Sequence, residues 1–262
     1  MASTEDKEMI QVMLIPETGK KLIGMAVAVH PAVKKALKSG TVVVIAGTTN
    51  GYAAEEILKT IGQAEGFSRD GFFRGVTVPR SIPADASGRQ AADRTFPGDA
   101  IIIKGKLLKG KTIFDVADEL KEGDVVIKGA NAVNTEQKRA AILIGHPKGG
   151  TVIAALQASI GRRVKTIIPV GLEKRVSGSL DELAEKVNAP GARGLRLLPV
   201  PGEILTEIEA VSIISGAEAE LFAAGGVCGA EGAVWLAVKG TAEEEKKIKK
   251  IIGALDKKTD KR

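Results

Sequence analysis

The segment from Thr41 to Leu58 joins a strand pattern, a small polar stretch and a helix pattern, in the order typical of α/β proteins. Residues 42–46 have the β-branched and small apolar composition of a buried strand. A predicted loop follows, made of Gly47, Thr48, Thr49, Asn50 and Gly51. Apolar residues then recur at helical spacing. This order places backbone N–H groups and hydroxyls at a helix N-terminus, and such a site favours an anion, most often a phosphate.

Strand-like and helix-like segments alternate through most of the chain, which indicates an α/β fold with a mainly parallel sheet. Hydrophobic residues make up 44% of the sequence and aromatic residues 3%, so the core must consist of Val, Ile, Leu and Ala. That composition fits parallel strands buried on both faces. We therefore predict an open, mostly parallel sheet flanked by helices. A single domain over residues 1–262 is expected, with a small additional lobe over residues 191–226 as an alternative.

The predicted elements can be placed by residue range. Strands are predicted at 9–15, 41–46, 76–78, 100–104, 124–127, 140–144, 165–170, 195–198, 219–223 and 233–238. Helices are predicted at 20–38, with a break at Pro31, and at 113–120, 151–160, 180–187 and 242–255. A further helix is predicted to begin after residue 51, and residues 105–111 are predicted to form a turn. Capping boxes at Ser179 with Glu182 and at Thr241 with Glu244 begin the last two helices.

The charge pattern favours a small anionic metabolite as the partner. The formal net charge is +6, but the Lys and Arg residues are spread among 32 acidic ones. The single Trp and single Tyr offer few platforms for stacking bases, so we expect no nucleic-acid partner. The lysines near the C-terminus are interpreted as a solvated helix face. A positive net charge that is spread along the chain still suits the binding of a small anion.

Several classes of protein have no support in this sequence. No apolar run approaches the roughly 18 residues that cross a bilayer, and the polar residues 1–8 are unlike a secretory signal. The single Cys gives neither a disulfide nor a metal-ligand pattern. Residues 47–51 match neither the Lys-containing nucleotide loop nor the Gly-x-Gly-x-x-Gly dinucleotide motif. We expect a soluble, cytoplasmic protein without a membrane partner, metal or cofactor, and a homo-oligomer.

The segment from Phe67 to Phe96 differs from the rest of the chain. It carries five arginines and four of the six phenylalanines among Gly, Pro and Ser. Long loops in compact domains are usually functional or disordered. Arginines here would close over a phosphate or carboxylate, or the segment would serve as a subunit contact or an ordered surface loop.

Further polar residues follow predicted strands, at the sheet edge where open α/β folds bind ligands. Asn131 follows the strand at 124–127 and is expected to orient the polar body of a substrate. Glu173 and Lys174 follow the strand at 165–170, and Lys174 would balance the charge of an anion. Residues 145–151 form a Gly-rich turn before a helix, which is a second candidate for an anion-facing helix start.

Together these motifs resemble the ribose-5-phosphate isomerase, glucosamine-6-phosphate deaminase and CoA-transferase superfamily. Residues 47–51 resemble the isomerase's phosphate-contacting GTGST loop, and Gly-Ala-Asn-Ala-Val-Asn at 129–134 resembles its GADEVD motif. Gly149-Gly150 resembles its Gly-rich turn, Glu173-Lys174 its D-x-S-K-like segment, and Leu198-Pro199-Val200 the LPVEV run that follows. The matches cover about residues 20–240. The resemblance implies a Rossmann-like sheet of the isomerase/CoA-transferase type and a sugar-phosphate isomerase-like activity. The Gly-Ala-Asn-Ala-Val spelling is also similar to initiation-factor-2B-type sugar-phosphate isomerases.

The sequence departs from the isomerase pattern where that enzyme carries its acidic residues. Asn131, Ala132 and Asn134 stand at these positions, and none of them takes up a proton near neutral pH. If the protein is an enzyme, Glu173 or Glu231 is the expected acid, base or nucleophile. A CoA-transferase-like enzyme would use Glu231, in the turn Gly229-Ala230-Glu231-Gly232, as its nucleophile. A non-catalytic metabolite-binding or oligomeric scaffold protein remains the alternative.

Overall fold

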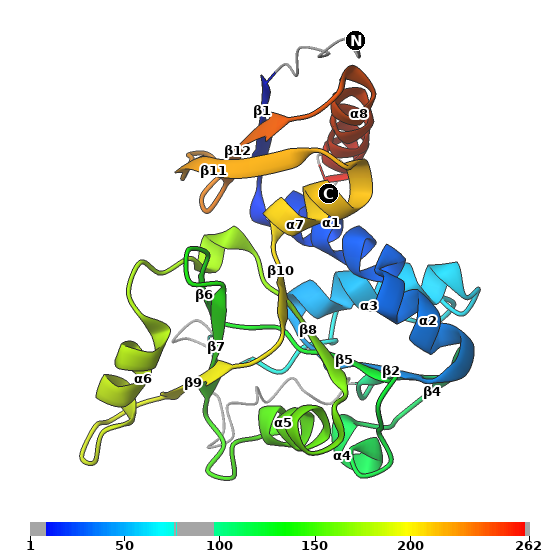
Figure 1. Ribbon diagram of the computed structural model, residues 1–262, viewed down its shortest axis with the longest axis vertical. Coiled ribbons are helices and arrows are strands. Elements are labelled where there is room, and N and C mark those ends of the chain that lie inside the picture. The colour runs from blue at the N-terminus through cyan, green and yellow to red at the C-terminus, as the bar shows by residue number, and fades with distance from the viewer. Residues whose placement is uncertain (1–8, 76, 78–96, 260–262) are drawn as a thin grey trace, which may run out of the picture.

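The computed structural model describes residues 9–75, 77 and 97–259, and its centre is a six-stranded sheet (Figure 1). The strand order is β10-β8-β5-β2-β3-β4. Neighbouring strands from β10 to β2 are parallel, whereas β3 and β4 are antiparallel to their neighbours. The prediction of an α/β fold with a mostly parallel central sheet is confirmed. The strands are β2 (Thr41–Val44), β3 (Ala100–Ile103), β4 (Lys106–Leu108), β5 (Val125–Ile127), β8 (Lys165–Pro169) and β10 (Glu203–Leu205).

Helices cover both faces of this sheet, which explains why its central strands are apolar without alternation. In β2, Val42 and Val44 pack into one buried cluster while Val43 packs into another. The first cluster is closed by α1 (Pro16–Val29), α2 (Pro31–Ser39) and α3 (Thr48–Thr60), and the second by α4 (Ile113–Val116) and α5 (Thr151–Arg162). Figure 1 shows α2 and α3 on one side of the sheet and α4 and α5 on the other.

A second, antiparallel sheet lies beside the central one and has the order β6-β7-β9. Its strands are β6 (Ala132–Asn134), β7 (Arg139–Ile144) and β9 (Arg196–Val200), and the connection to it contains the 3-10 turn η2 (Leu172–Lys174) and α6 (Leu180–Asn188). Alternate residues of β7 point to opposite faces: Ala140 and Ile142 pack toward α5 and β8, and Ala141 packs against α6. The second sheet therefore shares buried contacts with the central sheet.

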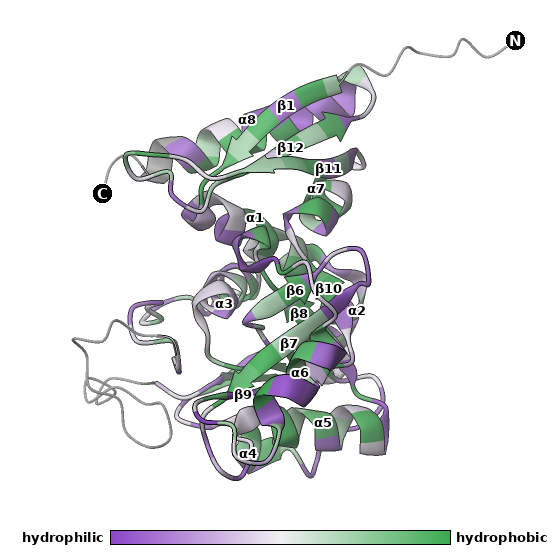
Figure 2. Cartoon of the chain, turned by 90° about the vertical axis from the view of Figure 1, so that its left-hand side faces the viewer, coloured by the Kyte–Doolittle hydropathy of each residue, from purple (hydrophilic) through white to green (hydrophobic). Residues whose placement is uncertain are grey.

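A third sheet joins the two ends of the chain. Its order is β1-β12-β11, formed by β1 (Met9–Leu14), β11 (Glu218–Ala224) and β12 (Val234–Lys239). With α7 (Glu207–Ser215) and α8 (Ala242–Thr259), it forms the upper part of Figures 1 and 2, with α1 below it. Leu14 and Leu236 belong to the same buried cluster as Val42 and Val44, so one continuous core extends from the central sheet to the third sheet.

Several predicted boundaries were wrong. Residues 48–51 form the first turn of α3 rather than a loop, because Gly51 N already donates to Gly47 O at 2.8 Å. Residues 105–111 were predicted as a turn, but 106–108 form β4. The helix predicted at 113–120 ends at Val116, and α1 begins at Pro16 rather than at Lys20. Of the strand predicted at 76–78, residues 76 and 78 lie outside the described residues.

Besides β4, the strands β6 and β10, the helix α7 and the 3-10 turn η2 were not predicted, and each is short or weakly patterned. Strands β6 and β10 have three residues each, too few for a period of two to be recognised. Helix α7 begins at a capping box in which Thr206 and Glu209 bond reciprocally. Both predicted N-caps do begin helices, since Ser179 Oγ accepts from Glu182 N and Thr241 Oγ1 accepts from Glu244 N. The reciprocal bond of a capping box is seen at Thr241, whose N–H donates to Glu244 Oε2 at 2.8 Å.

Candidate functional site

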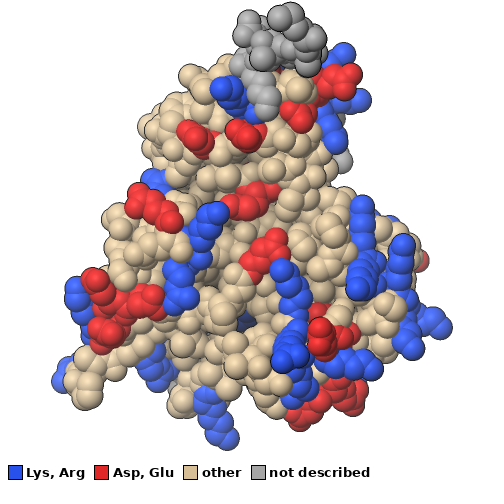
Figure 3. Space-filling view, in the orientation of Figure 1, with Lys and Arg blue, Asp and Glu red and all other residues tan. Residues whose placement is uncertain are grey.

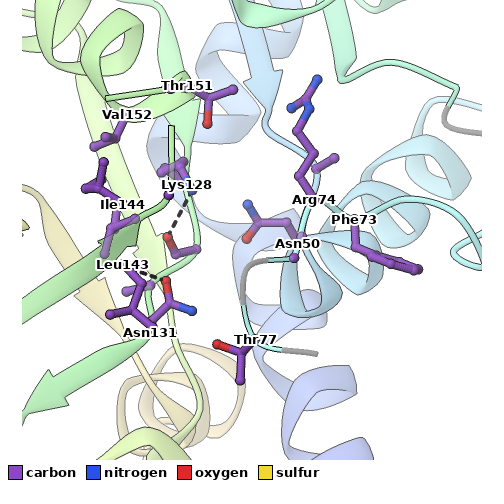
Figure 4. Close-up of a pocket in the computed structure, with 18 of the residues that line it drawn as sticks. Asn50, Phe73, Arg74, Thr77, Lys128, Asn131, Leu143, Ile144, Thr151 and Val152 are labelled. Carbon is purple, nitrogen blue, oxygen red and sulfur yellow. Dashed lines mark hydrogen bonds between the residues drawn. The ribbon is translucent and has the colours of Figure 1, made fainter. Parts of the chain in front are cut away.

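A cavity of about 660 Å³ opens at the carboxyl ends of β2 and β5 (Figure 4). Its walls come from segments far apart in the sequence: the first turns of α3 and α5, the residues after β5, and β7. In Figure 4, Lys128, Asn131, Leu143 and Thr151 lie on one side, and Asn50 and Arg74 on the other. No Asp or Glu of the described residues lines this cavity, whereas Arg74, Lys128 and Lys174 all do.

The first turn of α3 presents backbone donors to the cavity. Gly47 N donates to Phe72 O at 3.1 Å, and the backbone N–H groups of Thr48, Thr49 and Asn50 have no acceptor in the described chain. No side chain caps this helix. Thr49 is buried, and its Oγ1 has no hydrogen-bond partner among the described residues. The turn therefore retains the partial positive charge of an uncapped helix N-terminus.

The first turn of α5 reaches the same cavity. Gly149 and Gly150 precede it with φ of 79° and 69°, in the left-handed region that favours glycine. A Cβ atom at Gly149 would also clash with the Ile153 side chain. No side chain caps α5, and the N–H groups of Thr151 and Val152 have no acceptor in the described chain.

Other helices in the described chain satisfy their first N–H groups with side chains. His30 caps α2, Ser179 caps α6, and Thr206 caps α7. Helix α1 also lacks a side-chain cap; Pro16 removes one N–H group from its first turn, and this turn does not line the cavity. Of the helices without a side-chain cap, α3 and α5 meet at one cavity.

Asn50 closes the bottom of the cavity by bonding to two strands. Its Nδ2 donates to Ile45 O at 2.7 Å and to Ile127 O at 3.2 Å, just beyond β2 and at the end of β5. Both amide hydrogens are used in this way, so only Oδ1 is left, and it has no partner in the described chain. Oδ1 is itself buried, so Asn50 holds the ends of the two strands together and its side chain has no donor left for an anion.

Asp99 organises the opposite wall. Its buried carboxylate accepts from Ala46 N at 2.9 Å, from Ile113 N at 2.8 Å and from Arg74 Nη1 at 2.6 Å. These bonds fix the chain after β2, the start of α4 and the Arg74 guanidinium in one arrangement. The positive charge of Arg74 is balanced by this carboxylate.

Lys128 is the first residue after β5 and is partly buried in the wall of the cavity. It forms no ion pair with any carboxylate of the described residues, and its Nζ lies 3.5 Å from Gly129 O. Burial lowers the pKa of Lys128 to about 8; the Asp99 carboxylate opposes this change and the Arg74 guanidinium adds to it. A lysine with this pKa carries a substantial neutral fraction near neutral pH.

Asn131 presents its amino group to the cavity. Its Oδ1 accepts from Leu143 N at 3.0 Å, and this bond fixes the orientation of the amide. Figure 4 shows the Asn131 nitrogen directed away from Leu143 and into the cavity. Asn131, which the sequence predicts to orient the polar body of a substrate, therefore lines the cavity.

Glu173 and Lys174 occupy different positions relative to the cavity. Lys174 lines it, and its Nζ lies 3.4 Å from Glu173 Oε1, whereas Glu173 itself is not part of the wall. Behind Glu173, the buried Glu207 accepts from Leu172 N at 2.9 Å. Burial, and to a lesser extent the Glu173 charge, raises the pKa of Glu207 to about 7. The Glu173 carboxylate is thus close enough to Glu207 to influence its protonation.

The remaining predicted site residues lie away from the cavity. Gly51 is buried against Arg69 and Phe72. Glu231 is exposed in the turn between β11 and β12, where its Oε2 accepts from Gly229 N at 2.9 Å. The other predicted substrate-binding residues do line the cavity: Gly47, Thr48, Thr49, Asn50, Asn131 and Lys174.

Sequence reasoning missed Lys128 as a site residue and did not single out Arg74 within the Arg-rich segment. A signal existed for Lys128, because a charged residue directly after a buried parallel strand lies at the ligand-binding edge of the sheet. For Arg74 the distinguishing feature is its pairing with Asp99, which only the folded chain shows.

Comparison of the chain with models of protein families, with curated proteins and with solved structures found no match. Within the described residues, no group of three or more His, Cys, Asp and Glu side chains is placed to hold a metal ion. None of the helices in that part of the chain is both long and apolar enough to span a membrane.

Proposed function

We propose that this protein binds a phosphorylated or carboxylated small metabolite in the cavity between α3 and α5. The observation that carries the proposal is the meeting of two uncapped helix N-termini at one concave site. Backbone N–H groups and the helix dipoles favour an anion there, and together they would surround it from two directions. Figure 3 shows Lys and Arg interspersed with Asp and Glu on the face of the molecule, so the attraction for an anion is expected to be local to the cavity.

We further propose that the chain is a divergent relative of the isomerase and CoA-transferase superfamily. Four of the segments that carry the resemblance, at 47–51, 129–134, 149–150 and 173–174, contribute residues to the same cavity. In that arrangement residues 48–50 and 150–152 would hold the phosphate, and Asn131 would contact the rest of the substrate. Glu231 lies outside the cavity, so this placement gives the CoA-transferase alternative no support.

The proposal is tested by measuring binding of inorganic phosphate, ribose 5-phosphate, glycerol 3-phosphate and pyruvate, with ribose as the uncharged comparison. Calorimetric titration at low ionic strength gives each dissociation constant directly, with little screening of charge. We expect the anionic compounds to bind and ribose to bind far more weakly. Equal affinity for ribose and ribose 5-phosphate would contradict an anion site.

A pair of variants locates the site. Thr151→Glu places a carboxylate in the first turn of α5, where it favours the helix but repels a bound anion. Ala242→Glu places the same charge in the first turn of α8, away from the cavity. We expect Thr151→Glu to weaken phosphate binding at least tenfold and Ala242→Glu to leave it unchanged. Equal affinities in the two variants would place the anion elsewhere.

A further inference from the structure

The cavity contains one side chain that anion binding does not explain. Arg74 is paired with Asp99, and Lys174 lies near Glu173, but Lys128 has no carboxylate partner among the described residues. Its stem is partly buried in the wall, between the first turn of α5 and Asn131 (Figure 4). A lysine whose purpose is to neutralise an anion needs no such burial, because exposure keeps it fully charged.

The surroundings of Lys128 raise its neutral fraction above that of an ordinary lysine. The charged or titratable groups at the cavity are Arg74 with its partner Asp99, His146, and Lys174 with its neighbour Glu173. With a pKa of about 8, about a tenth of Lys128 is neutral at pH 7, against less than about a thousandth of an ordinary lysine. A neutral amine is the form that attacks a carbonyl carbon.

Asn131 supplies the complementary group for a carbonyl oxygen. Because its Oδ1 is held by Leu143 N, its amino group is fixed as a donor facing the cavity. A carbonyl oxygen accepts such a hydrogen bond, which polarises the carbon toward the nucleophile. Lys128 and Asn131 both lie in the short segment between β5 and β6, and both line the cavity.

We propose that Lys128 is a nucleophile and that its Nζ condenses with the carbonyl carbon of an aldehyde or ketone that carries a phosphate or carboxylate group. The inference rests on the proposed function, since the helix N-termini would hold the anionic end of the same molecule. The nitrogen lone pair forms the C–N bond while the carbonyl oxygen takes up a proton, giving a carbinolamine. Loss of the C–O bond then releases one water, which carries away both former amine hydrogens, and leaves the imine.

The imine is tested by reductive trapping. The protein is incubated with ribose 5-phosphate or pyruvate and sodium cyanoborohydride, and the modified lysines are identified by peptide mass spectrometry. Hydride from the reagent converts the imine to a stable secondary amine, so the labelled peptide gains the mass of the ligand less one oxygen atom. We expect Lys128 to be labelled at least ten times faster than the exposed Lys34 of α2, which measures nonspecific reaction.

Two controls separate the imine from binding. Glycerol 3-phosphate has no carbonyl and is expected to compete with ribose 5-phosphate and suppress labelling of Lys128. Lys128→Arg has no nucleophilic amine, and is expected to reduce the total incorporation of ligand to the level found at exposed lysines such as Lys34.

The outcomes distinguish the two proposals. Binding of the phosphate compounds, together with labelling of Lys128 no faster than Lys34, would overturn the imine and leave the anion site intact. Failure of every phosphate compound and of pyruvate to bind would overturn both. Fast labelling of Lys128 that glycerol 3-phosphate suppresses would support both.

Discussion

Asp99 is expected to be one of the most important single side chains for the stability of this fold and for the shape of the cavity. Its carboxylate is fully buried and accepts hydrogen bonds from Ala46 N, Ile113 N and Arg74 Nη1. The substitution Asp99→Asn keeps the size of the side chain but removes its charge and replaces one acceptor oxygen by a donor. At least one of the three donors then loses its acceptor, and the Arg74 charge loses its counterion.

The size of the effect follows from burial. Breaking a buried ion pair by removing one partner costs about 3–5 kcal/mol. Arg139 and Asp181 form a second pair at nearly the same distance, 2.7 Å against 2.6 Å, but the Asp181 side chain is 60% exposed. Exposed pairs contribute only about 0.2–1 kcal/mol, so Asp181→Asn is the matched control.

Urea unfolding followed by circular dichroism measures both variants. We expect Asp99→Asn to lower the free energy of unfolding by about 3–5 kcal/mol with an unchanged m value, and Asp181→Asn to lower it by less than about 1 kcal/mol. Similar losses in the two variants would show that burial of the Arg74–Asp99 pair does not have the energetic effect that we assign to it.

Three further predictions follow from the buried groups and one glycine. Glu207→Gln should remove a pH dependence of the free energy of unfolding. Because Glu207 has a pKa of about 7 in the folded protein and an ordinary value in the unfolded chain, the unmodified protein should lose stability as pH rises from about 4.5 to 7, and the variant should not. The exposed Glu218→Gln is the control, and parallel pH profiles for all three proteins would refute the assignment. Lys128→Met should be more stable than the unmodified protein at pH 7. The difference should shrink between about pH 8 and 10.5, where folded Lys128 is neutral while the unfolded chain still holds the proton, and urea midpoints that differ equally at both ends of this range would contradict this prediction. Gly149→Ala should lower the free energy of unfolding by about 1–3 kcal/mol because of its φ of 79° and the clash with Ile153, and a thermal midpoint equal to that of the unmodified protein would exclude this strain.

Much of the fold could be predicted because it follows from local patterns. The Val-rich segments at 42–44 and 125–127 are strands, since apolar β-branched runs bounded by turn residues have few alternatives. Ser179 and Thr241 mark helix starts, because each side-chain hydroxyl accepts a hydrogen bond from the backbone N–H three residues later, and this bond needs no distant part of the chain. The first turn of α3 was taken for a loop, since Gly, Thr and Asn have weak helix propensity and only the packed fold outweighs it.

The short strands could not be predicted, because their stability lies in their partners. Strand β10 has three residues and is recognisable only through its parallel pairing with β8. Strand β6 likewise depends on its antiparallel partner β7. The pairing of β1 with β12 joins the two ends of the chain, a contact for which no local pattern exists.

The sequence by itself determined the α/β class and the apolar strands, because each depends on residues that are neighbours along the chain. The tertiary structure alone decided that the first turns of α3 and α5 face one cavity, since segments far apart in the sequence meet only after the core has packed. It also decided the chemistry of single groups. Burial gives Lys128 and Glu207 pKa values of about 8 and about 7, and whether a side chain is buried is a property of its surroundings in the fold.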